Sequence, residues 1–234
     1  MRRVARGSVG RAEKQASVRD TFIDRVEAGR LLAARLAGMA LVDPVIIALP
    51  RGGVPVAAEI ADALHAPLDL LVVRKIGAPT DPEVAVAAIA EDMAEPQVSE
   101  TWRLELAGAR GGYVERATAA QRLEIARRRH AYLHDRPPLP LAGRTVVVVD
   151  DGVATGATLR AALGVIRRRG PGRLVVALPV APRDVLQTLQ DEVDDVVCLR
   201  QPVFFRAVGD WYEDFHQVCD DEVIALLRSR QAAR

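Results

Sequence analysis

The sequence predicts an α/β protein with a doubly wound, mostly parallel sheet flanked by helices. Short apolar runs alternate along the chain with segments of helical periodicity, as in a sheet whose parallel strands are joined by helices. Four consecutive valines at 146–149 suit a strand that is buried on both faces. Turns that contain glycine follow two of the apolar runs, at the strand ends where such folds bind ligands.

The elements are expected in a regular order. Apolar residues between Phe22 and Leu36 recur at helical spacing and predict a first amphipathic helix. Strands are then expected at 45–49, 68–73, 144–149, 174–180 and 193–199, with helices at 54–64 and 159–169. Residues 84–90 fit a strand or a helix, and a strand is favoured.

A long helical segment interrupts this order. Residues 105–134 are rich in Ala, Arg and Glu, and they predict one solvent-facing helix that ends before Pro137. The arginine run 127–129 within it is interpreted as a solvated helix face. With 234 residues, the chain can form one substantial core with some length left over.

The domain organisation follows from these segments. Residues 1–19 hold six basic residues and one acidic residue, with little apolar periodicity, and predict a flexible basic tail. Residues 20–234 are expected to form a single domain. Its core spans about 42–206, its helical insertion about 95–140, and a hood-like segment follows near the C-terminus.

Charge and composition limit the kinds of binding partner and the cellular location that are expected for this chain. A formal net charge of +1 gives no global case for specific binding to nucleic acid or to a membrane surface. No apolar run approaches the roughly 20 residues of a membrane span, and no export signal follows Arg2 and Arg3. A cytoplasmic location is therefore expected. Cys198 and Cys219 lack metal-binding spacing and are expected to be buried free thiols.

The segment 145–158 is the most informative part of the chain. Asp150 and Asp151 come where the valine strand ends, and a small polar turn and a helix follow. Free N–H groups and the helix dipole converge at such a turn and favour a phosphate. The carboxylates instead suit hydroxyl donors such as the 2′ and 3′ hydroxyls of a ribose. An ordinary turn capped by Thr158 is the alternative, but it does not need two adjacent carboxylates that repel each other.

This segment resembles the signature of the type I phosphoribosyltransferases, in which an apolar strand and two acids precede Thr-Gly-x-Thr. The resemblance implies that Asp150 and Asp151 are catalytic and hold the ribose of phosphoribosyl pyrophosphate (PRPP). It also implies four residues that bind the 5′-phosphate: Thr155, Gly156, Ala157 and Thr158.

Two further segments are similar to parts of the same family. Arg51, Gly52 and Gly53 follow the first sheet strand, where an anion nest can form, and they resemble the pyrophosphate loop. Arg74 and Lys75 end the next strand. They resemble the Arg-Lys segment of adenine phosphoribosyltransferases, which implies that Arg74 binds diphosphate and that Lys75 is catalytic. The alternative is two solvated charges at a strand end.

The segment 202–215 holds five of the nine aromatic residues. In purine-type members of the family an aromatic residue stacks on the base, which suggests Phe204 or Phe205 for this role. Asp210 is placed to reach the magnesium–diphosphate end. Packing of a C-terminal helix on the sheet explains the same aromatic residues equally well.

The resemblance implies transfer of a 5-phosphoribosyl group from PRPP to a small nitrogenous base, with release of pyrophosphate. Mg²⁺ is the expected cofactor, held chiefly by oxygens of the ligand. A homodimer is compatible with such an enzyme. The alternative is a non-catalytic regulator that senses PRPP or a nucleotide. A dinucleotide-binding oxidoreductase is disfavoured because no G-x-G-x-x-G follows a strand.

Ala154 bears on the acceptor. Hypoxanthine-guanine members of the family have an aspartate just before Thr-Gly, facing the base, whereas Ala154 can neither accept nor donate a proton. The chain is therefore expected not to be a hypoxanthine-guanine enzyme. In the adenine phosphoribosyltransferases a flexible lid begins after the Arg-Lys segment. An acid/base group is then sought in or near the corresponding region of this chain, with Glu83 and Glu91 as candidates, and water as the alternative.

Overall fold

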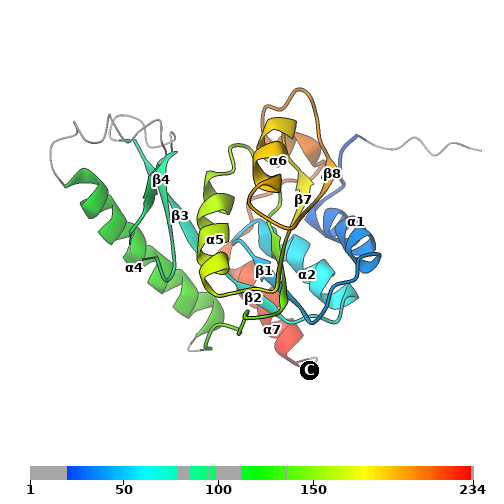
Figure 1. Ribbon diagram of the computed structural model, residues 1–234, viewed down its shortest axis with the longest axis horizontal. Coiled ribbons are helices and arrows are strands. Elements are labelled where there is room, and N and C mark those ends of the chain that lie inside the picture. The colour runs from blue at the N-terminus through cyan, green and yellow to red at the C-terminus, as the bar shows by residue number, and fades with distance from the viewer. Residues whose placement is uncertain (1–19, 79–84, 94, 99–111, 135, 233–234) are drawn as a thin grey trace, which may run out of the picture.

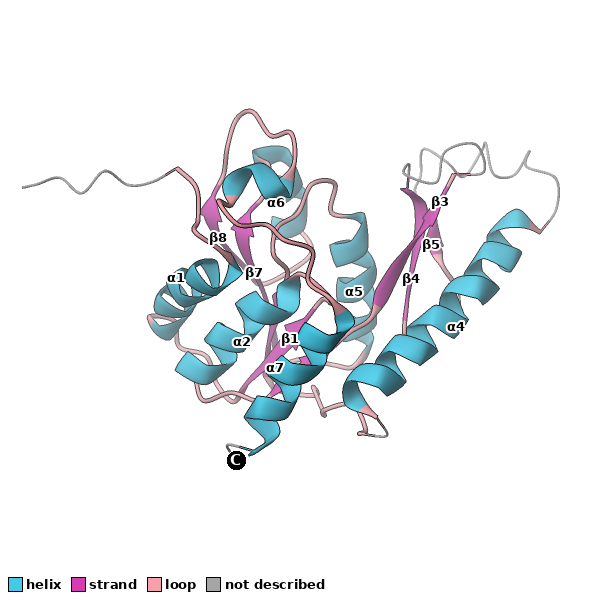
Figure 2. Cartoon of the chain, turned by 180° about the vertical axis from the view of Figure 1, so that it is seen from behind, coloured by secondary structure: helices cyan, strands magenta, loops and turns pink. Residues whose placement is uncertain are grey.

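The computed structural model describes residues 20–78, 85–93, 95–98, 112–134 and 136–232. Five strands form a parallel sheet in the order β2-β1-β6-β7-β8, and three form an antiparallel sheet in the order β3-β4-β5. Figure 1 shows α5 and α6 on one face of the parallel sheet, and Figure 2, drawn from behind, shows α1, α2 and α7 on the other. The predicted α/β class is confirmed. The basic tail at 1–19 lies outside the described residues.

The parallel sheet follows the expected alternation of strand and helix. In chain order its elements are α1 Arg25–Ala37, β1 Pro44–Ala48, α2 Gly53–Ala63, β2 Leu68–Leu70, β6 Thr145–Val149, α5 Ala157–Arg168, β7 Arg173–Val180, α6 Arg183–Gln190, β8 Asp195–Arg200, the 3-10 helix η1 Val208–Trp211 and α7 Asp220–Ala232. Along β6, Val146 and Val148 pack into the core under α5, whereas Val147 and Val149 pack into the core under α2. Burial on both faces explains the uninterrupted valine run.

The second sheet was not predicted. Its strands are β3 Val73–Gly77, β4 Ala85–Ala90 and β5 Gln97–Val98, and α4 Tyr113–Leu133 lies beside it. The single strand expected at 68–73 is wrong, because β2 pairs with β1 only as far as Leu70 and the chain then leaves that sheet. Val73 pairs instead with Ala90 of β4. The strand favoured at 84–90 is confirmed, and its Ile89 is fully buried in the core that contains α5.

The arginine run of α4 corrects another expectation. The Arg128 and Arg129 side chains are only 15% and 19% exposed, whereas the Arg127 side chain is 55% exposed. Arg129 donates to both carboxylate oxygens of Glu91 at 3.0 Å, and Arg128 donates to Glu124 at 2.7 Å. The interpretation as a solvated face is therefore wrong for these two residues.

Two segments far apart in the sequence meet beside β8. Phe22 forms a parallel bridge with Tyr212, and its backbone N–H donates to the carbonyl of Trp211 at 2.7 Å. The Phe22 and Tyr212 rings lie 5.3 Å apart, and both side chains are buried. The segment before α1 is thereby fixed to the segment after β8.

Two further observations concern membrane-spanning helices and the two cysteines. No helix among the described residues is long and apolar enough to cross a membrane. Both cysteines are free thiols. The prediction of a buried thiol is wrong for Cys219, which is exposed, and Cys198 is half-buried.

Candidate functional site

Two turns meet at the carboxyl edge of the parallel sheet. β1 and β6 pair as neighbours up to Ala48 and Val149, so the turns that follow them lie side by side. A Cβ atom on Gly53 would lie 2.7 Å from the Val149 carbonyl oxygen, and one on Gly52 would lie 1.9 Å from Asp151 Oδ2. Glycine is required at both positions because no side chain fits between the turns. The Pro50–Arg51 peptide bond in the first turn is cis.

The second turn leads into an uncapped helix. Gly156 is the N-cap of α5, with a left-handed φ of 78°, and it has no side chain to cap the helix. The amides of the first turn of a helix have no partner within the helix, so they are free to bind an anion at this end. Thr158 lies inside α5 rather than at its N-cap, so the alternative of a Thr158 cap is wrong.

The two aspartates between these turns have different partners. Asp151 Oδ2 accepts a hydrogen bond from Arg25 Nε at 2.8 Å, and the Asp151 backbone carbonyl accepts one from the Tyr212 hydroxyl. Asp150 Oδ1 accepts only from the Asp151 backbone N–H, at 2.9 Å, among the described residues. Burial and then the charge of Asp151 raise the pKa of Asp150 well above its usual value, while Lys75 and Arg25 oppose the shift. Asp150 is thus the acid with more free acceptor capacity.

Arg25 is the site residue that sequence reasoning missed. It belongs to α1, its side chain is 8% exposed, and its guanidinium carbon lies 3.9 Å from the centre of the Phe215 ring. It also donates to the His216 carbonyl at 2.9 Å. Since 126 positions separate Arg25 from Asp151, no local pattern in the sequence signals the pair.

Arg74 and Lys75 end up in different surroundings. Successive side chains of a strand point to opposite faces. Arg74 Nε donates to Gln121 of α4 at 2.9 Å, whereas Lys75 lies close enough to Asp150 for its charge to lower the pKa of that acid. Arg51 lies near Arg74, since its charge contributes, after burial and Arg128, to a lowered pKa of Arg74. Lys75 therefore lies on the side of Asp150, and Arg74 lies on the side of α4 and Arg51.

The predicted base-binding and metal-binding residues lie on the surface after β8. Phe204 is 91% exposed and Phe205 is half-buried. Both oxygens of Asp210 accept hydrogen bonds from Arg206 at 2.9 Å, which lowers the pKa of Asp210. Within the described part of the chain, no group of three or more His, Cys, Asp or Glu residues could hold a metal ion. The donor set fits Mg²⁺ only as an ion held mainly by the oxygens of a phosphate ligand.

The structure does not bring Glu91 to this site. Glu91 is buried under α4, where Arg129 binds it and Arg169 lies 3.9 Å away. Arg169 follows the last residue of α5, a helix of 12 residues and hence about 18 Å long, whose opposite end carries Gly156. The other acid/base candidate, Glu83, lies outside the described residues.

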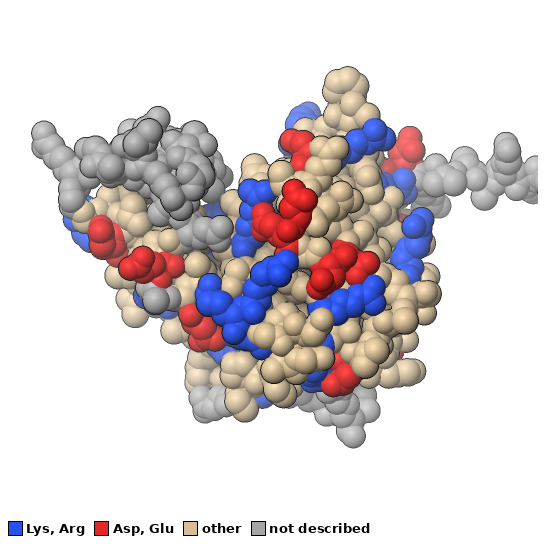
Figure 3. All heavy atoms as spheres, viewed as in Figure 1, with Lys and Arg blue, Asp and Glu red and all other residues tan. Residues whose placement is uncertain are grey.

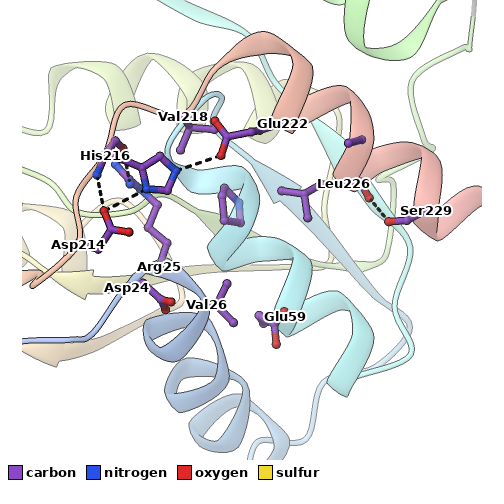
Figure 4. A pocket seen from close by; sticks show the side chains of 12 residues that line it. Asp24, Arg25, Val26, Glu59, Asp214, His216, Val218, Glu222, Leu226 and Ser229 are labelled. Atoms are coloured by element: carbon purple, nitrogen blue, oxygen red, sulfur yellow. Dashed lines mark hydrogen bonds and ion pairs between the residues drawn. The ribbon is translucent and has the colours of Figure 1, made fainter.

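A cavity of about 500 Å³ lies on the other side of Arg25. Its walls come from the start of α1, from α2 and α7, and from the segment that precedes α7 (Figure 4). His216 lies at its edge between Asp214, at 3.1 Å, and Glu222, at 3.0 Å, and these hydrogen bonds raise the pKa of His216. All these carboxylates have partners within the chain, so the two turns are the better candidate for a functional site.

Known proteins resemble this chain over most of its length. The family model "Phosphoribosyl transferase domain" matches residues 24–216. Two curated relatives from two strains of Mycobacterium tuberculosis, each named "Putative phosphoribosyl transferase", are 46% identical over 207 residues, which is 88% of this chain. The match covers 46% of each relative, so the chain spans about half their length. The crystal structure of a Thermus thermophilus protein, TT1426, is 44% identical, covers 89% of this chain and 98% of its own, and superposes with a TM-score of 0.75.

Proposed function

The chain belongs to the phosphoribosyl transferase domain family, and on this premise we propose that it binds PRPP and transfers the 5-phosphoribosyl group to a nitrogenous base. One observation carries the proposal. The glycine turn after β1 touches the acidic turn after β6, beside the uncapped N-terminus of α5. This arrangement offers neighbouring places for a diphosphate, a ribose and a phosphate.

The proposal assigns the two ends of PRPP to the two turns. The 5′-phosphate binds the backbone amides and hydroxyls of Thr155–Thr158, where the helix dipole favours a negative charge. The ribose hydroxyls donate to Asp150, which has acceptor capacity left. Asp151 contributes mainly through its backbone and its ion pair with Arg25. The diphosphate binds the turn of Arg51, Gly52 and Gly53.

Catalysis then consists mainly of positioning and charge stabilisation. A nitrogen lone pair of the base forms the new bond to C1 of the ribose while the bond from C1 to the diphosphate oxygen breaks, and the diphosphate leaves with both electrons of that bond. Arg51 and Lys75 stabilise the negative charge of the leaving group. Mg²⁺, when bound, would be held mainly by oxygens of the ligand and would neutralise further charge on the diphosphate.

The base itself is defined mainly by exclusion. Ala154 is exposed beside the phosphate turn and supplies no proton acceptor, which supports an acceptor other than hypoxanthine or guanine. Phe204 or Phe205 is the proposed stacking residue. We further propose a single domain in the cytoplasm, with a homodimer as a compatible assembly.

One observation favours the alternative of a non-catalytic PRPP or nucleotide sensor. Arg51 and Asp151 already have partners within the chain, Asp220 and Arg25. A ligand that rearranges these contacts would act as a switch without turnover.

The test measures binding and turnover separately. Mg²⁺-PRPP is expected to raise the melting temperature of the full chain, and Asp150→Asn is expected to remove most of this shift. Asp43→Asn is the matched control, because Asp43 pairs with Arg144 just before β1, at the opposite edge of the sheet. Pyrophosphate release is then measured with a panel of bases. An equal shift for Asp150→Asn and the wild type would refute the ribose assignment. Binding of PRPP without release for any base would favour the sensor.

A further inference from the structure

Helix α4 and helix α7 meet at Arg51 of the glycine turn. Arg51 Nη1 lies 3.4 Å from Asp220 Oδ1, in the first turn of α7. Arg127 Nη2 lies 3.4 Å from Asp220 Oδ2, and the buried Tyr132 donates its hydroxyl to Asp220 Oδ1 at 2.7 Å. A single carboxylate thus connects the proposed diphosphate turn to α4.

Two further guanidinium groups lie beside this contact. Arg74 uses Nε to bind Gln121, and Arg128 uses Nε to bind Glu124. Gln121, Glu124 and Arg128 lie on one face of α4 because they are spaced by three and four residues. The described residues offer no acceptor to the terminal nitrogens of Arg74 and Arg128.

Charge is not balanced in this cluster. Among the described residues, the four guanidinium groups of Arg51, Arg74, Arg127 and Arg128 share only two paired carboxylates, those of Glu124 and Asp220. Burial lowers the pKa of Arg74, and the positive charges of Arg128 and then Arg51 lower it further, as expected for crowded like charges. Figure 3 shows Lys and Arg side chains gathered near the middle of the molecular face that it displays. An added anion would relieve this repulsion.

We propose that Arg128 of α4 joins Arg51 and Arg74 at the diphosphate site and binds the outer phosphate of the diphosphate, and that Asp220 is an internal anion that this phosphate displaces from Arg51. The inference rests on the proposed function, because it takes the turn of Arg51 as the diphosphate site. Terminal guanidinium nitrogens suit phosphate oxygens because they form paired, charge-assisted hydrogen bonds.

Calorimetry of the full chain with inorganic pyrophosphate tests this inference, with ribose 5-phosphate as the second probe. Arg128→Gln is expected to weaken pyrophosphate binding about tenfold. Ribose 5-phosphate, which has no diphosphate, is expected to bind this variant as it binds the wild type. Glu124 keeps Arg127 as its partner in Arg128→Gln, so the fold is expected to survive. Arg128→Lys, which keeps the charge, is expected to recover part of the loss.

Asp220→Asn tests the displaced anion. The amide still accepts a hydrogen bond from Tyr132 but no longer competes as a charge for Arg51, so pyrophosphate is expected to bind severalfold tighter. Arg30→Gln is the matched control for Arg128→Gln, because the Arg30 side chain is 70% exposed and pairs with Glu59 of α2.

The outcomes separate this inference from the proposed function. Failure of the wild type to bind ribose 5-phosphate would refute the proposed function. Binding of ribose 5-phosphate together with equal pyrophosphate affinity in the wild type and Arg128→Gln would refute the extended site. Weaker or unchanged pyrophosphate binding by Asp220→Asn would refute the displacement.

Discussion

The carboxyl edge of the parallel sheet and the unit formed by the second sheet with α4 each contain a largely buried carboxylate paired with an arginine. The side chains of Asp151 and Arg25 are 15% and 8% exposed, and those of Glu91 and Arg129 are 7% and 19% exposed. Glu91 has both oxygens bound by Arg129 and a second arginine nearby, whereas Asp151 has a second carboxylate, Asp150, beside it. The pair of Glu91 and Arg129 is structural. The pair of Asp151 and Arg25 lies beside Asp150, which keeps charge and hydrogen-bonding capacity for a ligand. Polar groups that have no partner within the protein thus distinguish a candidate ligand-binding site from a purely structural ion pair.

The largest expected effect comes from breaking the pair at the sheet edge. Arg25→Met leaves the Asp151 carboxylate without its cation, and we expect the free energy of unfolding to fall by about 4 kcal/mol. Urea denaturation measures this loss. Adding Asp151→Asn to Arg25→Met is expected to restore most of the stability, because the unpaired charge is gone. Arg30→Met removes an exposed arginine from the same helix and is the control. A similar loss for Arg25→Met and Arg30→Met would contradict the difference between the two regions.

The second-largest effect is expected from the contact between the glycine turn after β1 and the acidic turn after β6. Gly52→Ala places a Cβ atom 1.9 Å from Asp151 Oδ2, so the acidic turn has to move away from the glycine turn. We expect PRPP and ribose 5-phosphate both to bind roughly a hundredfold more weakly by calorimetry, because the displacement reaches both proposed subsites. At Gly38 an added Cβ has its nearest neighbour at 3.5 Å, so Gly38→Ala is the matched control. Loss of PRPP binding with normal ribose 5-phosphate binding would show that the turns act independently.

The pair in the second region is tested through pH. Burial raises the pKa of Glu91 to about 7, against the opposing charges of Arg129 and Arg169. The folded state therefore keeps a proton that the unfolded chain releases near pH 4.5, and stability decreases as pH rises. Between pH 5 and 7 we expect Glu91 to lower the free energy of unfolding by about 2 kcal/mol.

Glu91→Gln removes this titration. Urea denaturation of the variant at pH 5 and pH 7 is expected to show a smaller decrease than in the wild type. Glu59→Gln, in α2 on the other side of the sheet, is expected to keep the pH dependence of the wild type. An unchanged slope in Glu91→Gln would mean that Arg129 keeps Glu91 ionised throughout this range.

The smallest expected effect concerns the exposed segment after β8. Phe204→Ala removes a side chain that is 91% exposed, so we expect the free energy of unfolding to change by less than about 0.5 kcal/mol. PRPP binding is also expected to be unchanged. The Michaelis constant for the base is expected to rise severalfold if Phe204 stacks on it. An unchanged constant would remove Phe204 from the proposed base site.

What could be predicted from the sequence was encoded locally. The strand at 145–149, the turn that follows it and the start of α5 all lie within one short segment, so their order in the sequence is also their order in space. Lys75 could be chosen because Arg74 and Lys75 resemble the Arg-Lys segment of the family, and the structure brings it near Asp150 although it lies in the middle of β3 rather than at a strand end. Their roles in binding PRPP stay predictions.

What could not be predicted depends on long-range contacts. The strand ends at Leu70 because its pairing with β1 ends there, and this end is not marked in the local sequence. The second sheet depends on pairing between Val73 of β3 and Ala90 of β4. Arg25 reaches Asp151 across 126 positions, and Arg128 comes near Arg74 and Asp220 only after α4 has docked. An arginine in a polar helical segment looks like a solvated residue until its neighbours are known.

The bridge between Phe22 and Tyr212 also gives the protein a spectroscopic reporter. Trp211, one of two tryptophans in the chain, accepts a hydrogen bond from Phe22 through its carbonyl and precedes Tyr212, whose hydroxyl binds the carbonyl of Asp151. The other tryptophan, Trp102, lies outside the described residues. In the variant Trp102→Phe the intrinsic tryptophan fluorescence comes from Trp211 alone. Trp211 is adjacent in sequence to Tyr212, which binds the acidic turn. Its emission can then be followed while PRPP is titrated, so that occupancy is read from the unlabelled protein.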